Sequence, residues 1–73
     1  MVIIPIMLET VDEVIEALGG PAEMARRLHT SPSNVGNWRL DGWIPPAWFW
    51  AVSNELWELH KEASPKVFRM RGA

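Results

Sequence analysis

Apolar residues recur at helical spacing along most of the chain, and the first such stretch lies between Thr10 and Gly19. Thr10 stands three residues ahead of Glu13, the spacing of a capping box that satisfies backbone N–H groups at the start of a helix. One face of the stretch is apolar and consists of Val11, Val14, Ile15 and Leu18. Gly19-Gly20 interrupts the pattern, so we predict a first helix that begins after Thr10 and ends before these glycines.

Two shorter stretches follow, and a proline stands at the start of each. Pro21 suits the first position of a helix that ends near His29, and Ser31-Pro32 combines an N-cap with a first-turn proline. The apolar positions of the two stretches are Ala22, Met24, Ala25, Leu28, Val35 and Trp38. Gly42 ends the second pattern, so we predict two short helices, the later one over residues 32–40.

The longest and most apolar stretch follows Pro45-Pro46. Proline fits the first turn of a helix, and helical spacing continues from Pro46 to about Glu62. The apolar stripe of this stretch is Trp48, Val52, Leu56 and Leu59. We therefore predict an aromatic helix over residues 46–62.

The two ends of the chain carry short patterns that favour β-structure. Residues 67–71 alternate partly between apolar and basic side chains, which fits a short strand or a frayed tail, and residues 2–4 are the obvious pairing partner. At 73 residues the chain is long enough for one domain only. We predict a compact all-α domain of four helices over residues 1–73, with residues 1–9 and 64–73 as terminal arms that form short strands if they pair.

Composition excludes several classes of protein. The chain has no cysteine, and His29 and His60 have no partner at metal-ligand spacing, so we expect neither a disulfide nor a metal site. It carries no Gly-rich phosphate loop and no nucleophile beside a base, so we expect no catalytic residues, no cofactor and no small-molecule substrate. The apolar residues 1–8 lack a preceding basic region and are too few to cross a bilayer, so we expect a cytoplasmic protein without a membrane partner.

The charge of the chain is small but unevenly distributed. The formal net charge at pH 7 is −2 and the pI is about 5.6, which argues against nonspecific binding to polyanions. Residues 1–20 contain four acids and no cation, whereas residues 64–73 contain three cations and no acid. The chain is therefore acidic at its start and basic at its end.

The second and third predicted helices fit a helix-turn-helix unit. If Pro21 is the first position of this unit, the small Ala25 falls at the fifth, where the two helices come closest. Leu28, Val35 and Trp38 fall at the eighth, fifteenth and eighteenth positions, which pack the two helices on each other. This spacing favours the unit over a chance corner of a helical bundle.

Three stretches carry a resemblance to a known family: residues 20–28, residues 31–38 and the run Trp38-Arg39-Leu40-Asp41-Gly42-Trp43-Ile44-Pro45. In them the chain resembles the phage Cro and repressor type of helix-turn-helix DNA-binding protein, and most of all its YdaS-like branch. The resemblance covers roughly residues 10–60 and places the motif at about residues 21–40. One departure is His29, because the family usually has glycine at this turn position; a left-handed non-glycine residue costs about 1 kcal/mol.

The resemblance implies sequence-specific binding of double-stranded DNA to regulate transcription, as a repressor does, with the helix over residues 32–40 in the major groove. Helical geometry, with Val35 and Trp38 turned inward, directs four residues outward: Ser33, Gly36, Asn37 and Leu40. Ser33 and Asn37 are expected to read bases, since both side chains hydrogen-bond to base edges, and Gly36 lets the backbone approach closely. The residues expected to hold phosphates are Ser31, Asn34, Arg39, Arg26 and Arg27.

The same residues also have ordinary structural explanations. Ser31 caps a helix in any protein, arginines on helices are usually solvated surface groups, and the spacing of Trp38 from Val35 fits a core position. The alternative function is a protein–protein interaction module, in which the aromatic helix over residues 46–62 docks a partner and the helix-turn-helix is scaffold. The acidic pI favours this alternative.

We also expect a homodimer. Five tryptophans are more than so short a chain buries comfortably, and exposed aromatic patches mark interfaces. A dimer would place two recognition helices about 34 Å apart on successive turns of the major groove. The residues expected at the dimer contact are Trp50, Trp57, Val67 and Phe68.

Overall fold

Helices form where the sequence carries local start and stop signals. The computed structural model describes residues 6–69. The helices are α1 (Val11–Ala17), α2 (Pro21–Leu28), α3 (Pro32–Asp41) and α4 (Phe49–Trp57), and two short 3₁₀ segments are η1 (Pro46–Trp48) and η2 (Pro65–Phe68). Two strands, β1 (Ile6–Leu8) and β2 (Lys61–Ala63), form a parallel pair. The predicted fold class, a compact and mostly helical domain with short strands, is therefore confirmed.

The predicted capping residues begin the first and third helices. The Thr10 hydroxyl accepts the N–H of Glu13 at 3.1 Å, and the Glu13 carboxylate accepts the N–H of Glu9 at 3.2 Å. The Ser31 hydroxyl accepts the N–H of Asn34 at 3.2 Å. The bonds from Glu13 and Asn34 satisfy N–H groups that the first turn of a helix leaves without partners, so the local sequence fixes where α1 and α3 start.

The turn between α2 and α3 is left-handed at His29, with φ 56° and ψ 45°. The N–H of His29 donates to the carbonyl of Arg26 at 3.3 Å, and the N–H of Thr30 donates to that of Ala25 at 2.9 Å. This backbone closes the last turn of α2 as a glycine would. The left-handed conformation expected at this turn is confirmed, and the residue that adopts it is His29 instead of glycine.

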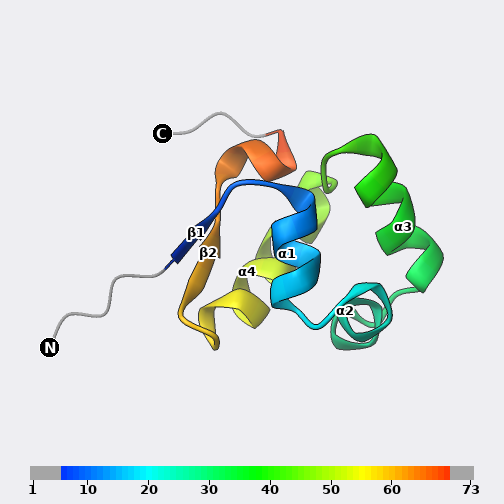
Figure 1. Ribbon diagram of the computed structural model, residues 1–73, viewed down its shortest axis with the longest axis horizontal. Coiled ribbons are helices and arrows are strands. Elements are labelled where there is room, and N and C mark those ends of the chain that lie inside the picture. The colour runs from blue at the N-terminus through cyan, green and yellow to red at the C-terminus, as the bar shows by residue number, and fades with distance from the viewer. Residues whose placement is uncertain (1–5, 70–73) are drawn as a thin grey trace, which may run out of the picture.

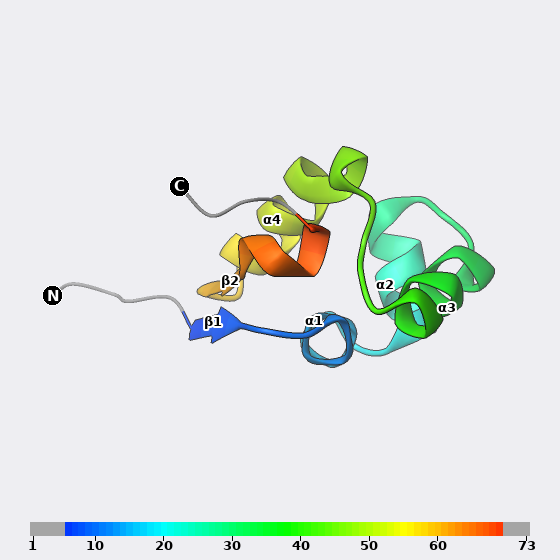
Figure 2. The ribbon, with the colours of Figure 1, turned by 90° about the horizontal axis from the view of Figure 1, so that it is seen from above.

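Figure 1 shows α2 and α3 together at one side of the molecule and the strands at the other, with α1 and α4 between them. Seen from above, β1, β2 and α4 follow one another in that order, and α2 and α3 lie together at the other side of the molecule (Figure 2). The core that joins these parts includes the fully buried Val14, Ile15, Met24, Val35, Ile44, Val52, Leu56 and Phe68. The rings of Trp38 and Trp48 meet with centroids 5.2 Å apart, so α3 and η1 share one aromatic contact.

The predicted helix over residues 46–62 is wrong beyond Trp57. The N–H of His60 bonds the carbonyl of Trp57 at 3.0 Å in a tight turn, and His60 is left-handed at φ 57°. Leu59 is consequently exposed rather than part of the buried stripe. The chain then extends as β2, in which Ala63 pairs with Leu8 of β1 and both side chains are buried. The backbone therefore pairs with β1 instead of continuing the helix, and no local sequence pattern predicts this pairing.

The predicted strand over residues 67–71 is wrong within the described part of the chain. Residues 65–68 form η2, and Val67 accepts the N–H of Ile44 at 2.8 Å. Phe68 packs edge-on against Phe49 with ring centroids 5.2 Å apart. Residues 2–4, 70 and 71 lie outside the described residues. Among residues 6–69, no helix has both the length and the apolar character that crossing a bilayer requires.

Candidate nucleic-acid interface

The corner between α2 and α3 is closed by the residues that the motif spacing assigned to it. Ala25, Leu28, Val35 and Trp38 are all buried. Ala25 is small enough to let the two helices approach, and Val35 and Trp38 hold α3 against the core. The orientation of α3 is therefore fixed, and its remaining side is left to solvent.

The outward side of α3 consists of the residues that helical geometry predicted. Ser33, Asn37 and Leu40 are exposed, and Leu40 reaches 85% of full exposure. A Cβ placed on Gly36 would meet no atom within 4 Å. Packing inside the protein therefore does not require glycine at this position. The missing side chain of Gly36 leaves room for another molecule to approach the backbone of α3.

The first turn of α3 is exposed, but the side chains of Ser31 and Asn34 already have partners there. Ser31 caps the helix, and the Asn34 amide donates to the Thr30 hydroxyl at 2.8 Å. This bond ties the start of α3 to the turn that follows α2. This bond uses one of the two N–H donors of the Asn34 amide, so the other is left to contact a phosphate.

Each of the three arginines assigned to phosphates lies in an ion pair within the chain. Arg26 contacts Glu23 at 2.6 Å, and hydrogen bonding between them lowers the pKa of the Glu23 carboxyl and raises the pKa of Arg26. Arg27 lies 3.3 Å from both Glu23 and Glu55. The free protein therefore presents little uncompensated positive charge on α2.

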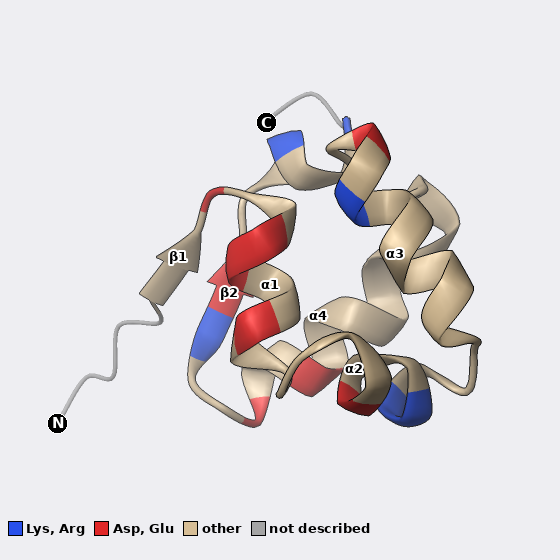
Figure 3. Cartoon of the chain, turned by 45° about the vertical axis from the view of Figure 1, so that its right-hand side comes forward, with Lys and Arg blue, Asp and Glu red and all other residues tan. Residues whose placement is uncertain are grey.

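Arg39 of α3 is held by the acidic helix α1. Its Nε lies 2.8 Å from Asp12 and its terminal nitrogen lies 3.7 Å from Glu16. Figure 3 shows acidic segments of α1 beside the basic segment toward the C-terminal end of α3. Because all three side chains are exposed, this network contributes little stability and can rearrange.

Arg69, which the sequence analysis did not assign, lies close to the end of α3. Its guanidinium carbon is 4.7 Å from the ring centroid of Trp43, the residue after the Gly42 cap of α3. Within residues 6–69 no carboxylate pairs with Arg69, whereas Lys66 contacts Glu9 at 2.7 Å. The surplus of cations near the C-terminus was the sequence signal for such a group. The N–H of Ile44 donates to the carbonyl of Val67 at 2.8 Å, and this bond holds η2, and with it Arg69, beside the segment that follows α3.

The residues expected at a dimer contact do not form one surface. Trp50 and Trp57 of α4 are 74% and 64% exposed, but Val67 and Phe68 are 2% and 0% exposed. The expectation for Val67 and Phe68 is wrong, because both side chains fill the core of a single chain. The two exposed tryptophans belong to α4, a helix that lies apart from α3 in both ribbon views (Figures 1 and 2).

Comparison with other proteins adds no relative. No family model matches the chain, and no match appears among the curated proteins or the solved structures. Within the described residues, no three His, Asp or Glu side chains gather as a metal site would need. The resemblance to Cro-like proteins therefore stays a prediction.

Proposed function

We propose that this chain binds double-stranded DNA sequence-specifically and regulates transcription, with α3 entering the major groove. The observation that carries the proposal is the outward side of α3, which is polar or small at Ser33, Gly36 and Asn37 and leaves Gly36 facing open space. Val35 and Trp38 are buried and hold α3 against the core, and the opposite side of α3 is exposed to solvent. Reading of bases in the major groove requires a helix arranged in this way.

The residues divide into those that read bases and those that hold the backbone. Asn37 reads adenine through a bidentate amide contact, and Ser33 donates to or accepts from a neighbouring base edge. Ser31, Asn34 and the arginines of α2 and α3 hold phosphates. Because those arginines must first exchange their own carboxylates for phosphates, nonspecific binding is weak, and affinity depends on the base contacts.

The test is selection of bound sequences from a random duplex library, followed by titration of the enriched site. Asn37→Ala should weaken binding to that site by about 1–3 kcal/mol and change binding to random DNA little. Asn54→Ala is the matched control, because Asn54 is also an exposed asparagine but lies on α4. Failure of the wild-type protein to enrich any sequence would refute the proposal, and equal losses on both DNAs would remove Asn37 from base reading.

A further inference from the structure

Leu40, on the outward side of α3, is the most exposed large apolar side chain among residues 6–69. It reaches 85% of full exposure, whereas the leucines that serve the core are buried, namely Leu8, Leu18, Leu28 and Leu56. Leu40 therefore contributes little to the packing of the described chain. Because removal of apolar surface from water is favourable, a molecule that covers Leu40 gains affinity from the contact.

The direction of Leu40 follows from its place on the helix. Successive residues of an α-helix are turned by about 100°, so Leu40 lies about 140° round the helix from the buried Val35 and about 160° from the buried Trp38. The same geometry places Leu40 within about 20° of Ser33, two turns earlier, and about 60° from Asn37, one turn earlier. Leu40 thus continues the line of side chains to which the proposed function assigns base reading.

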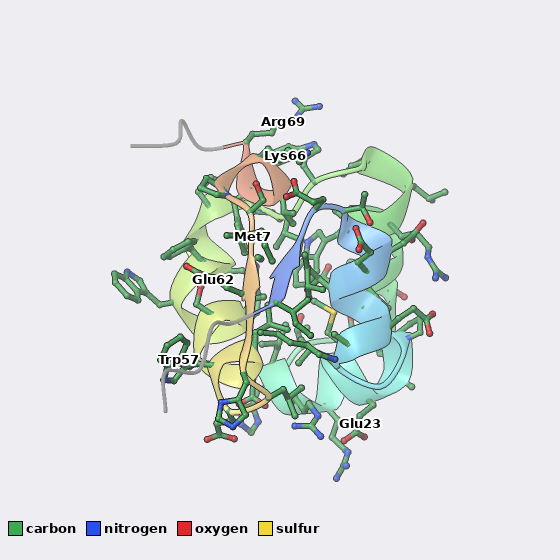
Figure 4. All side chains as sticks on the ribbon, turned by 60° about the vertical axis from the view of Figure 1, so that its left-hand side comes forward. Met7, Glu23, Trp57, Glu62, Lys66 and Arg69 are labelled. Carbon is green, nitrogen blue, oxygen red and sulfur yellow. The ribbon has the colours of Figure 1, made fainter. Side chains whose placement is uncertain are left out.

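The end of α3 that carries Leu40 lies near a cation. Figure 1 shows the last turn of α3 and η2 at one end of the molecule, and Figure 4 shows Arg69 and Lys66 together at this end. The Arg69 guanidinium carbon lies 4.7 Å from the ring centroid of Trp43, which follows soon after Leu40, and no carboxylate among residues 6–69 pairs with Arg69. A phosphate held by Arg69 would keep a duplex close to the last turn of α3.

The chemistry of leucine limits what Leu40 recognises in the major groove. Its side chain has neither a hydrogen-bond donor nor an acceptor, and the apolar group that base pairs present in this groove is the C5-methyl of thymine. Against a G·C pair, Leu40 would cover donors and acceptors of the bases without replacing their bonds to water, which costs free energy. Leu40 therefore favours thymine and disfavours a G·C pair.

We propose that Leu40 is a specificity residue that recognises thymine through its C5-methyl group, an inference that rests on the proposed binding of DNA by α3. Three residues of helix span about 4.5 Å and successive base pairs are about 3.4 Å apart, so the thymine lies one or two base pairs from the adenine that Asn37 reads. It lies on the side away from the base pair that Ser33 contacts, because Leu40 and Ser33 stand on opposite sides of Asn37 along the helix.

The test uses the duplex selected by the wild-type protein, in which the adenine is identified as the base whose selection Asn37→Ala abolishes. The neighbouring thymine is then replaced by uracil, which keeps the hydrogen-bonding groups of thymine and lacks only the methyl. The wild type should bind the uracil duplex about fourfold more weakly, which corresponds to about 0.8 kcal/mol for one buried carbon group.

Leu40→Ala removes the branched end of the side chain and should bind the thymine and uracil duplexes within about twofold of each other. Because Leu40 is so exposed, this variant should fold as the wild type does. Leu59→Ala is the matched control, since Leu59 is also a partly exposed leucine but lies in the turn after α4, and it should keep the wild-type difference.

Four results would overturn the inference. They are a selected site without thymine at these positions, equal binding of the two duplexes by the wild type, an unchanged difference in Leu40→Ala, and loss of the difference in Leu59→Ala. Each can occur while the wild-type protein still enriches a sequence, whereas failure of the proposed function appears as no enrichment at all. Tighter binding of 5-methylcytosine than of thymine at this position would assign Leu40 to a modified base instead.

Discussion

Neutralising Asp12 and Glu16 should raise the affinity of the protein for DNA. Both carboxylates hold Arg39, which lies on the flank of the outward side of α3. In the proposed complex Arg39 contacts a phosphate, so the free protein must first give up these pairs. The double variant Asp12→Asn/Glu16→Gln removes that competition and keeps the shape of both side chains.

The geometry sets the size of the effect. Arg39 lies 2.8 Å from Asp12 but 3.7 Å from Glu16, and all three side chains are at least 44% exposed. Exposed pairs contribute about 0.2–1 kcal/mol each, so the network is worth about 1 kcal/mol, or about fivefold in affinity. Because salt screens exposed charges, the gain should shrink as ionic strength rises above about 0.1 M. The variant should lose no more than about 1 kcal/mol of stability, which includes the favourable position of Asp12 at the start of α1.

The assay is fluorescence anisotropy of a labelled duplex that carries the selected site, titrated at several salt concentrations. Glu58→Gln/Glu62→Gln is the control, because it changes the net charge equally on carboxylates that pair with no cation among residues 6–69. Equal gains in the two double variants would show that net charge, and not release of Arg39, is responsible. No gain in Asp12→Asn/Glu16→Gln would refute the phosphate role of Arg39.

Three further predictions test the turn at His29, the cation Arg69 and the core residue Phe68. His29→Gly should leave the free energy of unfolding unchanged or raise it by up to about 1 kcal/mol, because His29 is left-handed, while His29→Val should lower it; equal falls in the denaturant midpoints would contradict this. Arg69→Ala should weaken binding to all DNA sequences and reduce the salt slope by about one, and a salt slope equal to that of the wild type would exclude Arg69 as a phosphate contact. Phe68→Ala should lower the free energy of unfolding by about 3–5 kcal/mol, as followed by circular dichroism, whereas a loss below about 1 kcal/mol would place Phe68 outside the core.

The candidate site could be predicted in part from the sequence. The outward residues of α3 follow from helical geometry once Val35 and Trp38 are turned inward, and both are buried. The partners of the arginines could not be predicted. Arg39 and Asp12 are 27 residues apart, and Arg27 and Glu55 are 28 apart, so only the packing of the helices brings them together.

For the fold, the sequence by itself determined α1, α2 and α3, because their ends depend on bonds between residues three to five apart. Thr10 and Ser31 cap helices through neighbouring N–H groups, and His29 closes α2 on the helix's own carbonyls. Only the tertiary structure decided where α4 ends, since the apolar pattern continues past Trp57 while the backbone leaves the helix to pair with β1, more than fifty residues earlier. Strand pairing over such a distance depends on the entropy of closing the chain and on the joint burial of Leu8 and Ala63. A sequence pattern analysed over short segments carries no information about either.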